Sequence, residues 1–218
     1  MFELNACNDA SVGKCVNRAA WILRGERIVV MLAEGAGRKT DAAFAAEFAI
    51  KCAAEMVGQE KHPLSPGQWL NIVSEIDVPL SLEPAGETTF VVADIGAKRI
   101  SGASVGDSKV FIVDTQMRDL TSNQQRKPLL GSGQAVTNAY EEDWSSGELL
   151  LCNAGLHKYA ARDKLVTNAT NMDARALIEL ARLPNGALFD DAVCVLLRRG
   201  KAATGHLPEG TIQHVRPA

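Results

Sequence analysis

The sequence predicts an α+β fold with largely antiparallel sheets, and three observations lead to that class. Strand-like runs at residues 89–95, 99–105 and 109–114 follow one another across short glycine turns, which is typical of an antiparallel meander. Apolar residues at every fourth position among many alanines predict a long helix over residues 40–57. Helices and strands do not alternate as β-α-β units do, so parallel sheets are not expected. A four-layer α-β-β-α sandwich buries the apolar helix faces on such sheets.

The other elements follow from local composition. Further strands are expected at residues 16–23, 28–32, 148–152 and 192–198. Further helices are expected at residues 67–76 and 173–183, and loops at residues 79–86 and 115–146. The first two strands turn at Gly25, and Thr40 or Asp41 is the expected N-cap of the first helix. The expected apolar stripe of that helix consists of Phe44, Phe48, Cys52 and Met56.

Composition places the chain among ordinary globular proteins. Of its 218 residues, 46% are hydrophobic and 22% are charged, so one domain is expected over residues 1–200, with a flexible C-terminal tail over residues 201–218. The net charge of −3 argues against a nucleic-acid partner, which binds clustered Lys and Arg. No membrane span or signal peptide is expected, so the predicted location is cytoplasmic. The five cysteines are expected to be reduced core residues rather than zinc ligands.

The apolar run at residues 29–37 ends by placing Glu34 and Gly35 in a glycine turn. A rigid strand end fixes a carboxylate, and glycine lets backbone carbonyls approach, so this turn is a candidate cation site. The alternative is a plain strand end with a solvated acid. Asp107 and the pair Asp190-Asp191 lie at comparable strand ends, which favours the cation site, although Asp107 also suits a tight turn.

Four sequence blocks carry a resemblance to a known family. They are Gly-Glu-Thr-Thr-Phe-Val-Val at 86–92, Ala-Ser-Val-Gly-Asp-Ser-Lys at 103–109, Gly-Glu-Leu-Leu-Leu-Cys-Asn-Ala-Gly-Leu at 147–156 and Asp-Asp-Ala-Val-Cys-Val at 190–195. With these blocks in this order, the chain resembles the metal-dependent Ser/Thr protein phosphatases of the PPM type (type 2C) along nearly its whole length. The resemblance implies a β-sandwich flanked by helices. It also implies two divalent cations, Mn or Mg, and attack of a metal-bridging hydroxide on phosphoserine or phosphothreonine.

The chain departs from the family pattern at the positions that the resemblance assigns to metal ligands. Glu34 and Gly35 stand where the family has Asp-Gly, and the longer Glu side chain places its oxygens differently. Ala154 stands where a ligating Asp is expected, and alanine offers no ligand. Asp190 matches the last metal acid, whereas Asn123 stands where an Asp can hold a third metal. The apolar scaffold is kept while most of the ligand positions have changed.

Basic residues stand at other site positions of the family. Lys14 replaces the Arg that binds the substrate phosphate, Arg18 replaces an acid, and Arg38 with Lys39 follows the first glycine turn. Lys14, Arg18 and Arg38 are therefore candidate phosphate-binding residues, the alternative being that they are ordinary solvated charges. The Arg-Lys-Pro sequence at 126–128 lies in a long loop that faces either a protein substrate or solvent.

Two functions follow from these departures. The first is a binding or regulatory pseudophosphatase for a protein or phosphoprotein partner. The second is a metal-dependent protein Ser/Thr phosphatase that is weakly active, or that an engineered Asp→Ala change at position 154 has inactivated. No catalytic residue is assigned, because a lone His157 beside an apolar turn is more often structural than a general acid. Trp69 and Trp144 are expected to be packing anchors.

Overall fold

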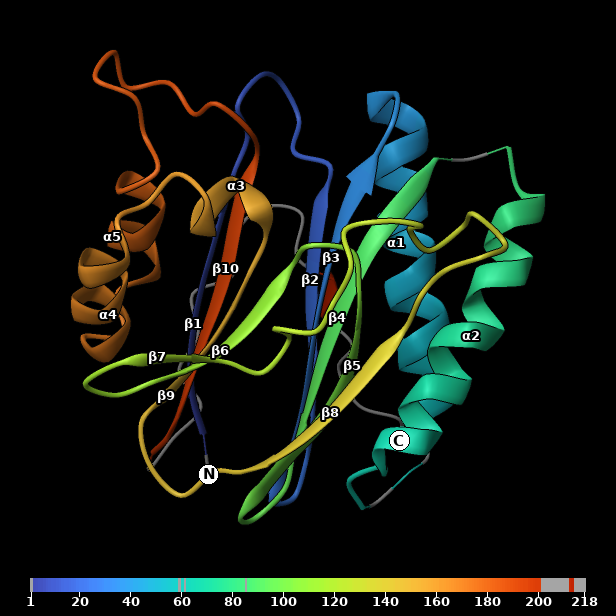
Figure 1. The fold of residues 1–218 in the computed structure, drawn as a ribbon, viewed down its shortest axis with the longest axis horizontal. Coiled ribbons are helices and arrows are strands. Elements are labelled where there is room, and N and C mark those ends of the chain that lie inside the picture. Colours follow the sequence, from blue (N-terminus) through green and yellow to red (C-terminus); the bar gives the residue numbers. More distant parts are fainter. Residues whose placement is uncertain (1, 59, 61, 85, 201–211, 214–218) are drawn as a thin grey trace.

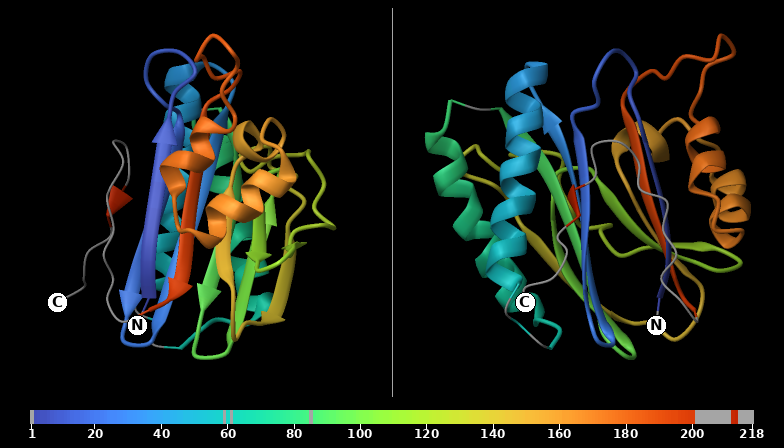
Figure 2. Two further views of the ribbon diagram at one scale, coloured as in Figure 1. Left: turned by 90° about the vertical axis from the view of Figure 1, so that its left-hand side faces the viewer. Right: turned by 180° about the vertical axis from the view of Figure 1, so that it is seen from behind.

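Four layers stack in the order helices, sheet, sheet, helices (Figure 1 and Figure 2). The computed structural model describes residues 2–58, 60, 62–84, 86–200 and 212–213. The helices α1 (Lys39–Val57) and α2 (Pro66–Leu82) cover the outer face of one sheet. The helices α4 (Arg162–Thr170) and α5 (Ala174–Glu179) cover the outer face of the other sheet. The expected four-layer α-β-β-α sandwich is confirmed.

The two sheets are antiparallel apart from one short pair. Sheet A has the strand order β1 (Phe2–Asp9), β10 (Ala192–Arg199), β9 (Glu148–Cys152), β6 (Lys109–Val113) and β7 (Met117–Asp119). Sheet B has the strand order β11 (Ile212–Gln213), β2 (Asn17–Arg24), β3 (Arg27–Ala36), β4 (Glu87–Ile95), β5 (Arg99–Val105) and β8 (Asn138–Asp143). Only β11 and β2 pair in parallel among the described strands. The α+β class is confirmed.

Three apolar layers separate the four structural layers, and β3 shows how one strand serves two of them. Val29 and Met31 pack toward α1 and α2, whereas Val30 and Leu32 pack toward sheet A. Successive side chains of a strand point to opposite faces, so a strand that is buried on both faces has a continuous apolar run. The third layer, which includes Leu177, lies between sheet A and the helices α4 and α5.

Alanine side chains form most of the contact face of α1, and Ile50 and Val57 are its larger apolar members. The alanines are Ala42, Ala45, Ala46, Ala49, Ala53 and Ala54. Phe44 and Met56 of the expected stripe are 47% and 39% exposed, and Phe48 and Cys52 are only partly buried. Small side chains let α1 lie close to both β3 and α2, since close packing leaves little room between elements.

The helix boundaries differ from the sequence expectation. α1 begins after Arg38, whose side chain makes no cap hydrogen bond, so the expected caps at positions 40 and 41 lie inside the helix. α2 continues beyond residue 76 and through Pro79. Ser65 and Gln68 form a capping box at its start, and Leu80 is buried near its end. The capping box and the burial of Leu80 outweigh the loss of one backbone hydrogen bond, which Pro79 cannot donate because it has no N–H.

Several elements occur where the sequence predicts none. β1 pairs with β10 along eight residues, although polar Glu3 and Asn5 interrupt its apolar pattern. The strands β7 and β8 form inside the polar stretch 115–146, which was expected to be loops. The short helix α3 (Ala154–His157) and α4 precede α5, which is shorter than the helix expected over 173–183. In each case pairing or packing with distant residues overrides weak local patterning.

The remaining expectations concern single features. Of the expected tail, residues 201–211 and 214–218 lie outside the described residues, and β11 pairs with β2. No helix in the described part of the chain is long and apolar enough to cross a membrane. All five cysteines are free thiols, and three of them are buried. Trp69 and Trp144 are buried, as expected for packing anchors.

Candidate functional site

A pocket of about 420 Å³ opens where strands of both sheets begin or end. Its walls come from the end of β3, the start of β4, the turn between β5 and β6, the start of α3 and the segment before β10. We call it the Glu34 pocket. It is lined by Glu34, Gly35, Ala36, Thr89, Asp107, Arg126, Lys127, Leu129, Ala154, Lys158, Tyr159, Phe189 and Asp190. The structure therefore brings together Glu34, Gly35, Ala154 and Asp190 of the sequence-predicted metal positions.

Glu34 lies on the face of β3 that points toward sheet A, in phase with Leu32. Burial, followed by the neighbouring Asp190 carboxylate, raises the pKa of Glu34 to about 7. Hydrogen bonds from the Asn153 side chain and the Ala154 backbone oppose this rise in pKa without cancelling it. The Glu34 backbone N–H donates to Thr89 Oγ1 at 3.1 Å, which fixes the strand end.

Gly35 holds the end of β3 against α1. A Cβ at this position would lie 2.0 Å from the Ala42 carbonyl oxygen, so only glycine allows this approach. The same argument applies to Gly155, whose Cβ would lie 2.1 Å from the Asp191 carbonyl oxygen. These two close backbone contacts fix the opposite walls of the Glu34 pocket.

The Asp107 carboxylate forms ion pairs with basic side chains from two other segments. Its Oδ2 lies 2.5 Å from Lys158 Nζ and 3.4 Å from Arg126 Nε. The Asp107 carbonyl oxygen lies 2.9 Å from His157 Nε2. Burial lowers the pKa of His157, and its hydrogen bond to the turn gives the ring a structural role. The Asp107 turn and the start of α3 are thus joined by two contacts.

The two acidic residues before β10, Asp190 and Asp191, make different contacts. Asp190 lines the Glu34 pocket, and its Oδ1 accepts the Asp191 backbone N–H at 2.8 Å. Asp191 is only 4% exposed and binds the loop between β1 and β2. Its carboxylate accepts hydrogen bonds from the N–H and Oγ of Ser11 and from the Val16 N–H. Only Asp190 of this pair is therefore directed to the pocket.

Ala154 contributes a methyl group to the pocket wall where the family resemblance places a carboxylate. The preceding Asn153 is fully buried and bridges the Asp191 carbonyl and the Val193 N–H, at 2.6 Å and 3.0 Å. Its amide is therefore already used within the protein. Asn123, the predicted third-metal position, is exposed and is not among the residues that line the Glu34 pocket.

The predicted phosphate-binding residues lie elsewhere. Lys14 and Arg18 line a separate pocket of about 560 Å³ near the start of α1. Arg18 Nη1 donates to the carbonyls of Cys15 and Asn17. Arg38 is 88% exposed in its side chain and pairs with an acid on its own helix. The side chain of residue 39 lies outside the described residues.

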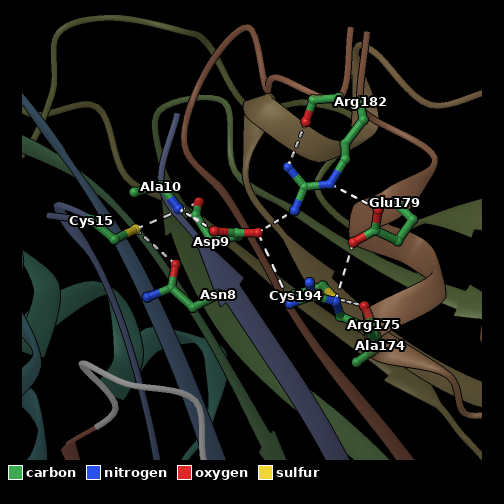
Figure 3. Close-up of polar contacts among 10 residues, drawn as sticks. Asn8, Asp9, Ala10, Cys15, Ala174, Arg175, Glu179, Arg182 and Cys194 are labelled. Atoms are coloured by element: carbon green, nitrogen blue, oxygen red, sulfur yellow. Dashed lines mark hydrogen bonds and ion pairs between the residues drawn. The ribbon is translucent and has the colours of Figure 1, made fainter. Parts of the chain in front are cut away.

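Figure 3 shows the polar contacts around the end of β1, where Asn8, Asp9, Ala10 and Cys15 also line the second pocket. Asp9 forms ion pairs with Arg182 and Arg175, and Arg182 also pairs with Glu179. The Cys15 thiol donates to Asn8 Oδ1 at 2.8 Å, and burial raises its pKa to about 12. These contacts join β1 to α5 and make this part of the pocket wall structural.

The basic residues of the Glu34 pocket are Arg126, Lys127 and Lys158. The loop that carries Arg126 and Lys127 is held to α2, because Asp77 accepts the N–H groups of Gly131 and Gly133. The Arg-Lys pair is visible in the sequence as a loop feature. Lys158 carries a weaker signal, namely that it lies one helical turn after Ala154.

The donor set does not fit a pair of divalent cations. Such hard ions need several carboxylate oxygens, whereas Ala154 supplies none and Asp107 is paired with Lys158 and Arg126. Within the described ranges, no group of three or more His, Cys, Asp and Glu side chains has an arrangement that could hold a metal ion. Glu34 and Asp190 are the carboxylates that remain.

The amino-acid sequence matches no protein-family model and no curated protein sequence. Solved structures do share the fold. Stp1, a serine/threonine phosphatase from Staphylococcus aureus, is 17% identical with a TM-score of 0.76, over 92% of this chain and 96% of that one. The catalytic domain of PstP in complex with two manganese ions is 16% identical with a TM-score of 0.71, over 90% of this chain and 97% of that one.

The PstP structure from Mycobacterium tuberculosis is 17% identical with a TM-score of 0.70, over 90% of this chain and 97% of that one. These proteins are serine/threonine phosphatases, and the likeness extends over nearly the full length of each chain. This chain has the fold of the bacterial PPM-type Ser/Thr protein phosphatases, as its sequence blocks predict.

Proposed function

We propose that this protein binds a phosphorylated protein through the Glu34 pocket and has lost efficient phosphate-ester hydrolysis. It would then be a binding or regulatory pseudophosphatase. The donor set is the observation that carries the proposal. Ala154 replaces an oxygen ligand, and Lys158 engages Asp107. The catalytic domain of PstP, which has a similar fold, has a structure in complex with two manganese ions. A manganese or magnesium pair would lack ligands here.

The chemistry of the pocket mouth supports a phosphate ligand. Arg126, Lys127 and Lys158 supply N–H donors, and charged donors form the strongest hydrogen bonds to phosphate oxygens. The three basic side chains equal in number the three carboxylates that line the pocket, which are Glu34, Asp107 and Asp190. The site therefore carries no large negative charge that would repel an anion. The structural neighbours are serine/threonine phosphatases, which favours phosphoserine or phosphothreonine in a protein as the ligand. The cytoplasmic location stays a prediction.

Replacing Lys158 with methionine is expected to weaken binding of a phosphoserine peptide by about tenfold. Methionine keeps the aliphatic stem and removes the ammonium that faces the pocket, and one charge-assisted hydrogen bond accounts for an effect of this size. Fluorescence polarisation with a labelled peptide measures the change. Lys164→Met, on the exposed face of α4, is the matched control and should bind as the unaltered protein does. Equal affinity for phosphorylated and unphosphorylated peptides would refute the proposal.

Ala154→Asp is expected to leave manganese binding and hydrolysis of p-nitrophenyl phosphate at background. One restored carboxylate does not replace the Asp107 oxygens that Lys158 engages. Calorimetry with manganese, followed by the hydrolysis assay on the same sample, measures both properties. Tight binding of two ions by the unaltered protein would overturn the pseudophosphatase. Rescue of manganese-dependent hydrolysis by Ala154→Asp would instead favour a phosphatase that the alanine has inactivated.

A further inference from the structure

Two exposed aromatic side chains stand at the mouth of the Glu34 pocket. Phe189 is 67% exposed and Tyr159 is 42% exposed, although both line the pocket. Their ring centroids lie 5.0 Å apart with the planes tilted by 37°, an arrangement typical of attractive aromatic pairs. An exposed aromatic pair beside a polar pocket offers an apolar contact surface to a bound partner.

Backbone contacts fix the two chain segments that carry the rings. The Tyr159 N–H donates to the Leu156 carbonyl at 3.2 Å, which continues the turn of α3. Phe189 follows Leu188, which is 6% exposed and pairs with Arg182 in an isolated β-bridge. Leu188 therefore packs into the core, whereas Phe189 points outward. The backbone on both sides of the aromatic pair is therefore joined to the fold.

Each aromatic residue is the chain neighbour of a charged pocket residue. Tyr159 follows Lys158, and Phe189 precedes Asp190. Consecutive Cα atoms lie about 3.8 Å apart, in the pocket wall as in a bound peptide. A peptide whose phosphate reaches Lys158 therefore places a side chain next to the phosphorylated residue within reach of Tyr159 and Phe189.

On the basis of the proposed function, we infer that Tyr159 and Phe189 form an apolar surface at the pocket mouth, called the apolar step, which selects among phosphoprotein segments. The favoured segment carries a large apolar residue directly beside the phosphoserine or phosphothreonine. Charge complementarity identifies this occupant: the basic groups Lys158, Arg126 and Lys127 take the phosphate, and the aromatic pair takes the apolar neighbour. An all-apolar ligand would cover the charged side chains of the pocket without replacing their hydrogen bonds to water, and a free phosphate would leave the rings exposed.

Four peptides test the inference by fluorescence polarisation. They carry either phosphoserine or serine, flanked by either leucine or glycine. The unaltered protein is expected to bind the phosphoserine peptide with leucine about tenfold more tightly than the one with glycine, as aromatic anchors commonly achieve. Phe189→Ala, and the double variant with Tyr159→Ala, should lose this preference and keep their affinity for the phosphoserine peptide with glycine. Leu82→Ala, at an exposed apolar residue of α2, is the control and should retain the preference.

The outcomes separate the two claims. Equal affinity of the unaltered protein for the two phosphoserine peptides overturns the apolar step and leaves phosphate recognition standing. A leucine preference that survives the double variant also overturns it. Serine peptides that bind as tightly as phosphoserine peptides overturn the proposed function, and absence of binding by all four peptides overturns both. Thermal unfolding of each variant confirms that these exposed substitutions leave the fold intact.

Discussion

Asp94→Ala is expected to destabilise the protein by about 3 to 5 kcal/mol, the loss typical of a buried ion pair that keeps one charge. Asp94 is fully buried, and Arg27 is 3% exposed. The two oxygens of Asp94 accept Arg27 Nε and Nη2, each at 2.7 Å. One oxygen also accepts the Leu64 N–H at 2.8 Å and the Trp69 indole N–H at 3.2 Å. Alanine would leave the buried Arg27 guanidinium without its counter-charge, with the Glu60 carbonyl still accepting its Nη1, and would leave two N–H groups without an acceptor.

Urea unfolding followed by circular dichroism measures this loss. Asp94→Asn keeps an acceptor oxygen while it removes the charge, so it should cost less than alanine and remain measurable if the alanine variant fails to fold. Asp143→Ala is the matched control. Its carboxylate is 84% exposed and pairs with Arg99 at 3.5 Å, so a change below about 1 kcal/mol is expected. Similar, small effects of Asp94→Ala and Asp143→Ala would contradict the role of Asp94 as a buried acceptor of four hydrogen bonds.

The contacts of Asp94 also show why part of the fold cannot be predicted from the sequence. The run 89–95 is correctly predicted as a strand because its apolar pattern is local. Asp94 interrupts that run as a single acid, and its partners Arg27, Leu64 and Trp69 lie 67, 30 and 25 residues away. β1 is a similar case, since it is defined by pairing with β10 at the far end of the chain. Contacts of such long range leave no local period in the sequence.

The candidate site, like the fold, is only partly predictable from the sequence. Glu34, Gly35, Ala154 and Asp190 are found together because each lies within two residues of a strand end, and these strand ends meet at the same edge of the sandwich. Lys14 lies in the loop between β1 and β2, Arg18 is the second residue of β2, and both line the second pocket. Three contacts of the Asp191 carboxylate hold that loop there, and the sequence shows none of them. Lys158 reaches the site through an unexpected short helix.

Glu34→Gln is expected to stabilise the protein by about 3 kcal/mol at pH 8 in a chelating buffer, and to have little effect at pH 4.5. In the folded protein the pKa of Glu34 is raised from 4.5 to about 7, by burial first and by Asp190 second. The folded state therefore holds the proton more tightly than the unfolded state. Stability from this group is fully present below pH 4.5 and is lost as the pH rises through 7. Gln is uncharged at every pH and avoids that loss.

Urea unfolding of both proteins between pH 4.5 and 8 measures the difference, with Glu75→Gln on the exposed face of α2 as the control for one lost charge. The control should show no step across this window. Adding millimolar manganese then separates the two functions in a single experiment. If the pocket held metal through Glu34, manganese would stabilise the unaltered protein and not the Gln variant. A pseudophosphatase with too few ligands should instead show the same pH step with and without the metal.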